Sequence, residues 1–244
     1  MTTELLSIGK TASMLGVSID TLRRWDNTGR IRSVRSGPAG HRYYIRSDIE
    51  LFLQDEVALA RQWAESQKGT VPAASQYCQT RDVFQARLES LQSNLSRHFP
   101  VGITSLIIAV CGEIGNNSFD HNLGNWPDVP GIYFSHSLKD RKVVVADRGQ
   151  GIWTTLKRVR PKLKSSSEAL KMAFTEIVSG RQPEVRGNGL KFVREVIIHN
   201  PLILKFQTGD AMLLLKQGDT DIIVDRADNF IQGCFAIIEF GKYI

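Results

Sequence analysis

The first 65 residues alternate between short apolar stripes and turn residues, which predicts small helices and one hairpin. Residues 8–16 and 19–27 have helical spacing, and Ser18 between them is a good N-terminal cap. Residues 31–46 alternate around a Gly-Pro-Ala-Gly turn, as a β-hairpin does. Residues 47–63 carry an apolar stripe typical of a longer helix that begins at a Ser cap. Together these elements predict a winged helix-turn-helix.

The pattern after residue 80 predicts a second, larger set of elements. Residues 153–186 are polar, basic and partly helical, with the helix expected at 168–178. Pro100 is expected to separate the helix at 81–97 from the helix at 104–121. Helices are expected at 81–97, 104–121 and 190–199, and strands at 131–137, 142–146, 202–207, 211–216 and 234–240.

Composition supports two domains joined by a linker. The chain of 244 residues is comfortable for two domains, and its hydrophobic content of 42% is that of a globular protein. Residues 66–80 are poor in large aliphatics and rich in Gln, Ser, Ala, Gly and Pro. The prediction is therefore an α+β protein with a winged helix-turn-helix domain at 1–65, a linker at 66–80 and a second domain at 81–244.

Positive charge is concentrated in the first domain. The net charge is +6, and residues 21–46 hold seven arginines with Asp26 as the only acid. Such a cluster attracts polyanions, and in a winged helix-turn-helix the second helix enters the major groove while the wing follows the backbone. The candidate DNA-binding residues are Thr21, Arg23 and Arg24 on the second helix, and Arg35, His41, Arg42 and Tyr43 on the wing.

Ordered motifs in the first domain strengthen this hypothesis. The strings Thr-Leu-Arg-Arg-Trp, Gly-Arg-Ile, Gly-His-Arg-Tyr-Tyr and Ser-Asp-Ile-Glu follow one another in about residues 5–55. They resemble the MerR/excisionase-type domain, and most closely the version found in some transposon-associated serine recombinases. The resemblance implies double-stranded DNA as partner. One small module makes few contacts, so we expect a homodimer on paired half-sites. We expect Trp25 in the core.

A polar stripe on the helix at 104–121 carries candidate chemistry. Glu113, Asn117 and His121 are spaced at i, i+4 and i+8, which places their side chains on one helix face. A carboxylate can polarise a water or a hydroxyl, and an amide oxygen can ligate a hard cation such as Mg²⁺. His121 has a second interpretation, because a histidine at the end of a helix can simply satisfy the helix dipole.

Two glycine-punctuated turns lie downstream of this stripe. Asp147-Arg148-Gly149-Gln150-Gly151 follows a Val-rich strand, and its glycines allow a tight backbone turn. Gly187-Asn188-Gly189-Leu190 precedes the helix at 190–199, where bare amides and the helix N-terminus can bind phosphate. Arg186 and Lys191 flank the second turn and add positive charge.

These three pieces, in this order, resemble the ATP pocket of the GHKL superfamily of gyrase-like and histidine-kinase-like ATPases. The resemblance covers about residues 81–240 and implies a Bergerat-type α/β sandwich, a mixed, largely antiparallel sheet with helices on one face. It implies Glu113 as general base, Asn117 as Mg²⁺ ligand and Asp147 as acceptor for the adenine amino group. Ser118 stands where the family usually has Ala. The implied ATP-binding set is Asn117, His121, Asp147, Gly149, Gly151, Arg186, Gly187, Gly189, Leu190 and Lys191.

Three functions are consistent with this combination, with ATP and Mg²⁺ as cofactors. The first is a DNA-binding transcriptional regulator in which nucleotide switches DNA, dimer or partner contacts. The second is a serine kinase of the anti-sigma-factor type that acts on a partner protein. The third is a DNA-binding ATPase subunit of a mobile element or defence system. The sequence leaves open whether the protein is an enzyme, either an ATPase or a protein serine kinase.

Two further features bear on partners and location. Five basic residues and no acid lie in residues 153–164, and they can serve either a triphosphate or DNA. No uncharged apolar stretch reaches the roughly 18 residues of a membrane span, and three scattered cysteines match neither a disulfide set nor a metal site. We therefore expect a cytoplasmic protein with no membrane partner.

Overall fold

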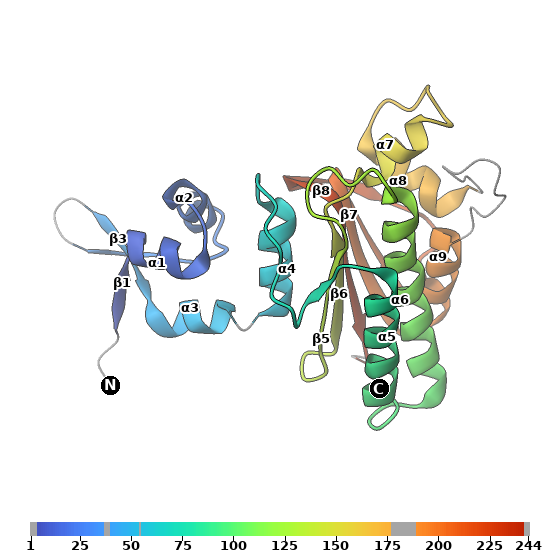
Figure 1. The fold of residues 1–244 in the computed structure, drawn as a ribbon, viewed down its shortest axis with the longest axis horizontal. Helices are drawn as coiled ribbons and strands as arrows, with labels where there is room; N and C mark the ends of the chain where they lie inside the picture. The colour runs from blue at the N-terminus through green and yellow to red at the C-terminus, as the bar shows by residue number, and fades with distance from the viewer. Residues whose placement is uncertain (1–3, 37–39, 54, 177–188, 242–244) are drawn as a thin grey trace. The chain divides into compact units, whose positions relative to one another are not determined.

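A computed structural model describes residues 4–36, 40–53, 55–176 and 189–241 (Figure 1). Contacts within the chain divide it into two compact units, Met1–Leu59 and Ala60–Ile244. The first unit contains the following elements in chain order: β1 (Leu5–Ser7), α1 (Ile8–Leu15), α2 (Ile19–Asn27), β2 (Val34–Ser36), β3 (His41–Ile45) and α3 (Arg46–Leu53).

The first unit has the predicted helix-turn-helix followed by a wing. The Ser18 hydroxyl accepts the Thr21 amide at 3.1 Å and caps α2, while Gly16 ends α1 with a φ of 65°. Strand β3 pairs antiparallel with both β2 and β1, so a strand that the pattern did not predict completes a three-stranded sheet. Trp25 and Tyr44 are buried in the small core between these elements, as expected for Trp25.

The single helix predicted at 47–63 is two helices in the structure. Helix α3 begins at Arg46, one residue before the predicted Ser cap, and α4 (Glu56–Glu65) is separate. The Asp55 carboxylate accepts the amides of Val57 and Ala58 at 3.0 and 3.2 Å, which caps a new helix start. Helix α4 begins in the first unit and ends in the second, because the division falls between Leu59 and Ala60.

The second unit is an antiparallel sheet with helices packed on it. Its strands follow the order β4-β5-β6-β8-β7, and every described pairing is antiparallel. This confirms the predicted α+β class with a mainly antiparallel sheet. The elements are β4 (Tyr77–Cys78), α5 (Arg81–Leu95), α6 (Val101–Asn122), β5 (Ile132–Ser137), β6 (Lys142–Asp147), α7 (Gly151–Lys157), α8 (Ser166–Thr175), α9 (Gly189–His199), β7 (Leu202–Lys216) and β8 (Val224–Phe240).

Both faces of this sheet are covered. Alternate residues such as Phe134 and Val145 join the core beneath α5, α6 and α9, which lie on one face (Figure 1). On the other face, α4 covers the strands, and the Trp63 ring lies 6.0 Å from that of Tyr133. Part of the predicted 66–80 linker is strand β4, which pairs with β5 and so belongs to the sheet.

Two further elements differ from the pattern. The strands predicted at 202–207 and 211–216 form one long strand, β7. The pairing with β8 shifts register between Thr208 and Ala211, where Gly209 takes a φ of 58°. Helix α7 occupies part of a segment expected to be irregular. None of the described helices is long and apolar enough to cross a membrane.

Candidate functional site

Asp147 ends strand β6 as a buried carboxylate. The Ser118 hydroxyl of α6 donates to its Oδ2 at 2.7 Å, and the Gly149 amide donates to its Oδ1 at 2.8 Å. Burial raises the pKa of Asp147, while both hydrogen bonds favour the ionised form. Ser118, which departs from the expected Ala, therefore orients the carboxylate.

The glycines of the turn after Asp147 have little room for a side chain. A Cβ atom added to Gly149 would collide with the Asn122 amide, which accepts the Gln150 backbone N–H at 2.8 Å. Gly151 takes a φ of 75°, a backbone conformation that favours glycine. Gly233 of strand β8 lies against this turn, and a Cβ there would collide with Asp147 backbone and carboxylate oxygens. The close packing of bare backbone fixes where the carboxylate points.

Gly189, the first residue of α9, meets the polar stripe of α6. A Cβ atom built on Gly189 would lie 2.5 Å from Glu113 Oε2 and 3.1 Å from Asn117 Nδ2. Only a residue without a side chain allows the start of α9 to approach these two groups. The sequence fragments that carry Glu113 and Gly189, 76 residues apart in numbering, are therefore adjacent in space.

A cavity of about 90 Å³ connects this corner with Asp147. It is several times larger than the roughly 10–15 Å³ that one water molecule needs. The predicted residues that line it are Asn117, His121, Asp147, Gly151, Gly189 and Leu190. Glu113 borders the site through its approach to Gly189. Gly149 and Lys191 are not among the lining residues. Arg186 and Gly187 lie outside the described residues.

His121 lies in the wall of the cavity. Burial lowers the pKa of its imidazole, which favours the neutral ring at physiological pH. A neutral ring offers one donor and one acceptor to a ligand. The Gln150 amide donates to the His121 carbonyl at 3.4 Å, so the end of α6 is also tied to the glycine turn.

Several residues that shape the site were missed by the sequence interpretation. Asn122 continues the four-residue spacing from Ser118, which is a signal that could have been used. The Thr208 hydroxyl donates to the Gly233 carbonyl at 2.9 Å and accepts the Ile152 amide at 3.1 Å. It thereby joins β7, β8 and the start of α7. No local sequence pattern predicts the role of Thr208, because that role depends on how β7 and β8 pair.

Arg148, next to Asp147, is completely buried. Its Nε and Nη2 donate to Asp128 Oδ2 at 2.9 and 2.6 Å, and its Nη1 donates to the Trp63 carbonyl of α4 at 2.6 Å. Burial raises the pKa of Asp128, but the hydrogen bonds and charge of Arg148 outweigh this and lower it overall. Arg148 thus fastens the turn at the cavity to α4.

The DNA-binding candidates differ in what they already contact. Arg24, Arg35 and His41 are exposed on α2 and the wing. Arg23 is exposed but lies 2.8 Å from Asp20 of the same helix. Thr21 is partly buried, and its hydroxyl shares a hydrogen bond of 2.9 Å with Ser18.

Arg42 holds the wing to α2. Its Nε lies 2.6 Å from Asp26 Oδ2, and its Nη2 donates to Asn27 at 3.3 Å. Burial raises the pKa of Asp26, but the hydrogen bonds from Arg42 and Ser33 lower it overall. The neighbouring Tyr43 is half-buried. Among the predicted residues, Arg42 therefore already has a structural role within the unit.

Comparison with known proteins finds a family match within the first unit. Residues 7–44 match the model of the MerR family regulatory proteins. This confirms the MerR-like prediction for that segment and shows a DNA-binding type of domain. The type II methyltransferase M.Eco47II of Escherichia coli is 35% identical over 68 residues, which are 28% of this chain and 16% of the methyltransferase. The chain thus spans only a small part of that relative.

Two solved structures are similar to the chain at low identity. One is the ATP-binding domain of Francisella tularensis topoisomerase IV in complex with a small-molecule inhibitor, at 18% identity and a TM-score of 0.34, covering 54% of this chain and 35% of that one. The other is the 43K ATPase domain of Thermus thermophilus gyrase B in complex with an aminocoumarin. Its identity is 16% and its TM-score 0.35, covering 63% of this chain and 39% of that one.

Proposed function

We propose that the protein binds DNA through its first unit and Mg²⁺–ATP through its second, and that nucleotide binding switches its DNA, dimer or partner contacts. One observation carries the nucleotide part. Glu113 and Asn117 of α6, the Asp147 turn and the bare backbone of Gly189 meet around or beside one cavity. Calorimetric titration of the protein with Mg²⁺–ATP and with a non-hydrolysable analogue tests nucleotide binding directly.

Asp147 is suited to select adenine. Its carboxylate accepts three donors from the protein: the Ser118 hydroxyl and the backbone amides of Gly149 and Cys234. An ionised carboxylate offers about four lone-pair sites. One site therefore remains for a hydrogen of the adenine amino group, whereas guanine would present a carbonyl oxygen at this position.

The opposite corner of the cavity is suited to phosphates and Mg²⁺. Mg²⁺ commonly uses one or two protein oxygens together with phosphate oxygens, and Asn117 supplies such an oxygen. No group of three His, Cys, Asp or Glu residues that could hold a metal by itself is found in the described parts of the chain. Arg186, Gly187 and Lys191 are proposed phosphate contacts. Bound Mg²⁺–ATP would supply a phosphoryl group, and Glu113 would take a proton from the attacking water or hydroxyl.

Glu113→Gln is expected to retain ATP binding and to slow phosphate release about 10²–10⁴-fold, because the amide cannot act as a base. Titration and phosphate-release assays measure the two effects separately. Glu89→Gln on the exposed side of α5 is the matched control and should behave like the unaltered protein. An unchanged hydrolysis rate in Glu113→Gln would remove Glu113 from the reaction.

The connection between Arg148 and α4 supports a switch. Arg148 follows Asp147 in the chain and donates to the carbonyl of Trp63 in α4, the helix that continues into the first unit. A change at the Asp147 turn would therefore act on the segment that leads to the DNA-binding elements. ATP can shift such an equilibrium only by its different affinity for the two states. DNA affinity and oligomeric state, measured with and without nucleotide, test this.

The alternatives make different predictions for the same site. A serine kinase would use Glu113 as base for a partner hydroxyl, and labelled γ-phosphate would then appear on a protein. A defence or mobile-element subunit would couple ATP turnover to DNA binding.

Arg24→Ala is expected to weaken DNA binding by about 1–3 kcal/mol for a base contact, or to reduce the salt slope by about 1 for a phosphate contact. Arg24 is exposed on α2, so its loss should leave the melting temperature unchanged. Arg97→Ala, at an exposed position of the second unit, is the control. Fluorescence anisotropy at several salt concentrations measures the effect, and binding equal to the control would contradict the role of α2.

A further inference from the structure

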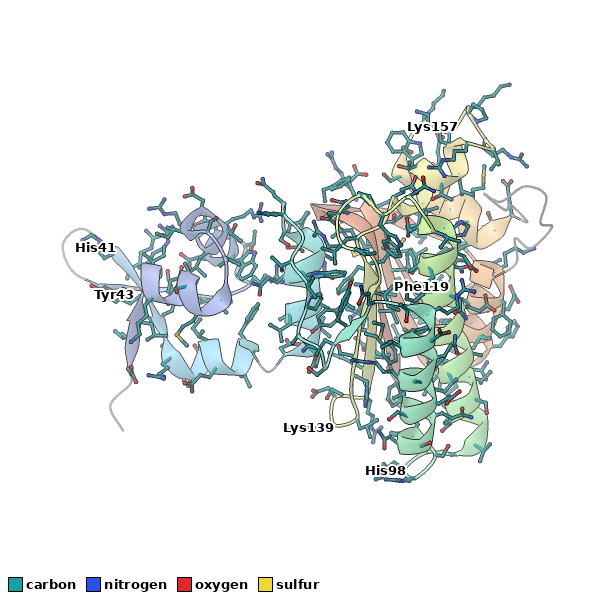
Figure 2. All side chains as sticks on the ribbon, viewed as in Figure 1. His41, Tyr43, His98, Phe119, Lys139 and Lys157 are labelled. Atoms are coloured by element: carbon teal, nitrogen blue, oxygen red, sulfur yellow. The ribbon has the colours of Figure 1, made fainter. Side chains whose placement is uncertain are left out.

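What we call the basic loop surface consists of five cations at the end of helix α7 and in the loop after it: Lys157, Arg158, Arg160, Lys162 and Lys164. All five side chains are exposed. Residues 151–167 contain no acid, and the next acid, Glu168, accepts the backbone amide of Lys164 at 2.9 Å. Figure 2 shows Lys157 at the opposite end of the second unit from Lys139 in the β5–β6 turn.

A small core holds the basic loop surface in place. Leu156, Leu163 and Ala169 are buried together, with Trp153 and Val159 packed against them. The Trp153 indole donates to the Leu163 carbonyl at 3.4 Å, and the Arg160 amide donates to that of Leu156 at 2.8 Å. The loop is therefore folded, and its cations project from a defined backbone.

The cavity and the five cations involve different residues of this segment. Gly151, Ile152, Thr155 and Leu156 line the cavity, but none of the five cations does. Lys157 lies over the Trp153 ring, with Nζ 5.0 Å from the centroid, and Arg158 donates to the neutral Gln150 side chain. As far as the described residues go, no ion pair with a carboxylate involves any of the five.

We propose that the basic loop surface binds the phosphate backbone of duplex DNA, as a second DNA contact besides the winged helix-turn-helix. Exposed cations that form no ion pair with a carboxylate gain most from phosphates, because their binding releases condensed counterions from the nucleic acid. Such contacts position the protein and carry no sequence information. The proposal rests on the proposed DNA-binding function and extends it to the second unit; it does not depend on ATP binding.

The test compares two full-length variants of equal charge. The first carries Arg160→Gln, Lys162→Gln and Lys164→Gln, and the second carries Lys68→Gln, Lys139→Gln and Lys216→Gln at exposed positions elsewhere in the second unit. Affinity for a duplex of random sequence is measured by anisotropy between low and moderate salt. The slope of log K against log salt should decrease by about 2–3 in the first variant, since each lost phosphate contact contributes about 0.9. The control slope should stay nearly unchanged.

Three outcomes would overturn the proposal. Equal slopes in the two variants would show that only net charge matters. Weaker Mg²⁺–ATP binding with unchanged DNA binding would assign the cations to the triphosphate. An equal loss of binding to poly-glutamate would assign them to acidic protein partners. A failure of the ATP proposal is recognised separately, because Asp147→Asn and Glu113→Gln report on the cavity and leave the basic loop surface intact.

Discussion

Asp147→Asn is expected to abolish measurable ATP binding while the protein stays folded. The substitution removes a charge-assisted hydrogen bond, worth about 1.5–3 kcal/mol, and can turn an amide donor toward the adenine amino group, which costs about 1–3 kcal/mol more. The affinity should fall at least ~100-fold, because each 1.4 kcal/mol is tenfold. Calorimetric titration measures the loss. The preference for ATP over GTP should narrow at the same time, since the rejecting carboxylate is gone.

The control for this experiment is Asp225→Asn, which changes an exposed carboxylate on β8 that does not line the cavity. It should bind ATP as the unaltered protein does. Thermal unfolding of both variants verifies that the fold is retained. If Asp147→Asn bound ATP with unchanged affinity and unchanged base preference, the adenine assignment would be wrong, whatever the effect of Glu113→Gln.

Arg148→Ala is expected to destabilise the second unit by about 1–3 kcal/mol, because it removes the buried guanidinium that donates to Asp128 and to the Trp63 carbonyl. Asp128 is exposed and the Trp63 carbonyl keeps the Ser66 hydroxyl as a donor, so the loss stays below that of a fully buried ion pair. For a domain of this size it corresponds to a fall in melting temperature of roughly 2–12 °C. Differential scanning calorimetry measures the transition.

Two further variants separate charge from geometry at this position. Arg148→Lys retains a charge but loses the planar fork, so it should recover only part of the stability. Arg97→Ala removes an exposed arginine and should stay within about 0.5 kcal/mol of the unaltered protein. A melting temperature of Arg148→Ala equal to that of Arg97→Ala would contradict the anchoring role of the buried guanidinium.

Local patterns were sufficient for much of the fold and for the centre of the site. Helices α5, α6 and α9 follow strong apolar stripes, and β5 and β6 follow short apolar runs, so their positions were predicted within a few residues. Glu113 and Asn117 are one helical turn apart, and that spacing alone places them on one face. The convergence of Gly189 on this face came from the resemblance to a known family, not from spacing.

Features that depend on distant contacts were not predictable in this way. The composition of residues 66–80 resembles that of a linker, yet strand β4 pairs with β5 because that edge of the sheet needs a partner. Arg148 stands between the motif residues Asp147 and Gly149, and its partners Asp128 and Trp63 come from other segments. Thr208 likewise depends on how β7 and β8 pair around the shift at Gly209.

The covering of the sheet by α4 determines how the protein can be dissected. A fragment that started at residue 81 would lack Trp63, whose ring packs near Tyr133, and would expose apolar side chains to aggregation. A fragment that started at Asp55 would keep the capped helix and the Arg148 anchor together. Limited proteolysis should accordingly spare the paired Tyr77–Cys78 stretch, even though its surroundings have the composition of a cleavable tether.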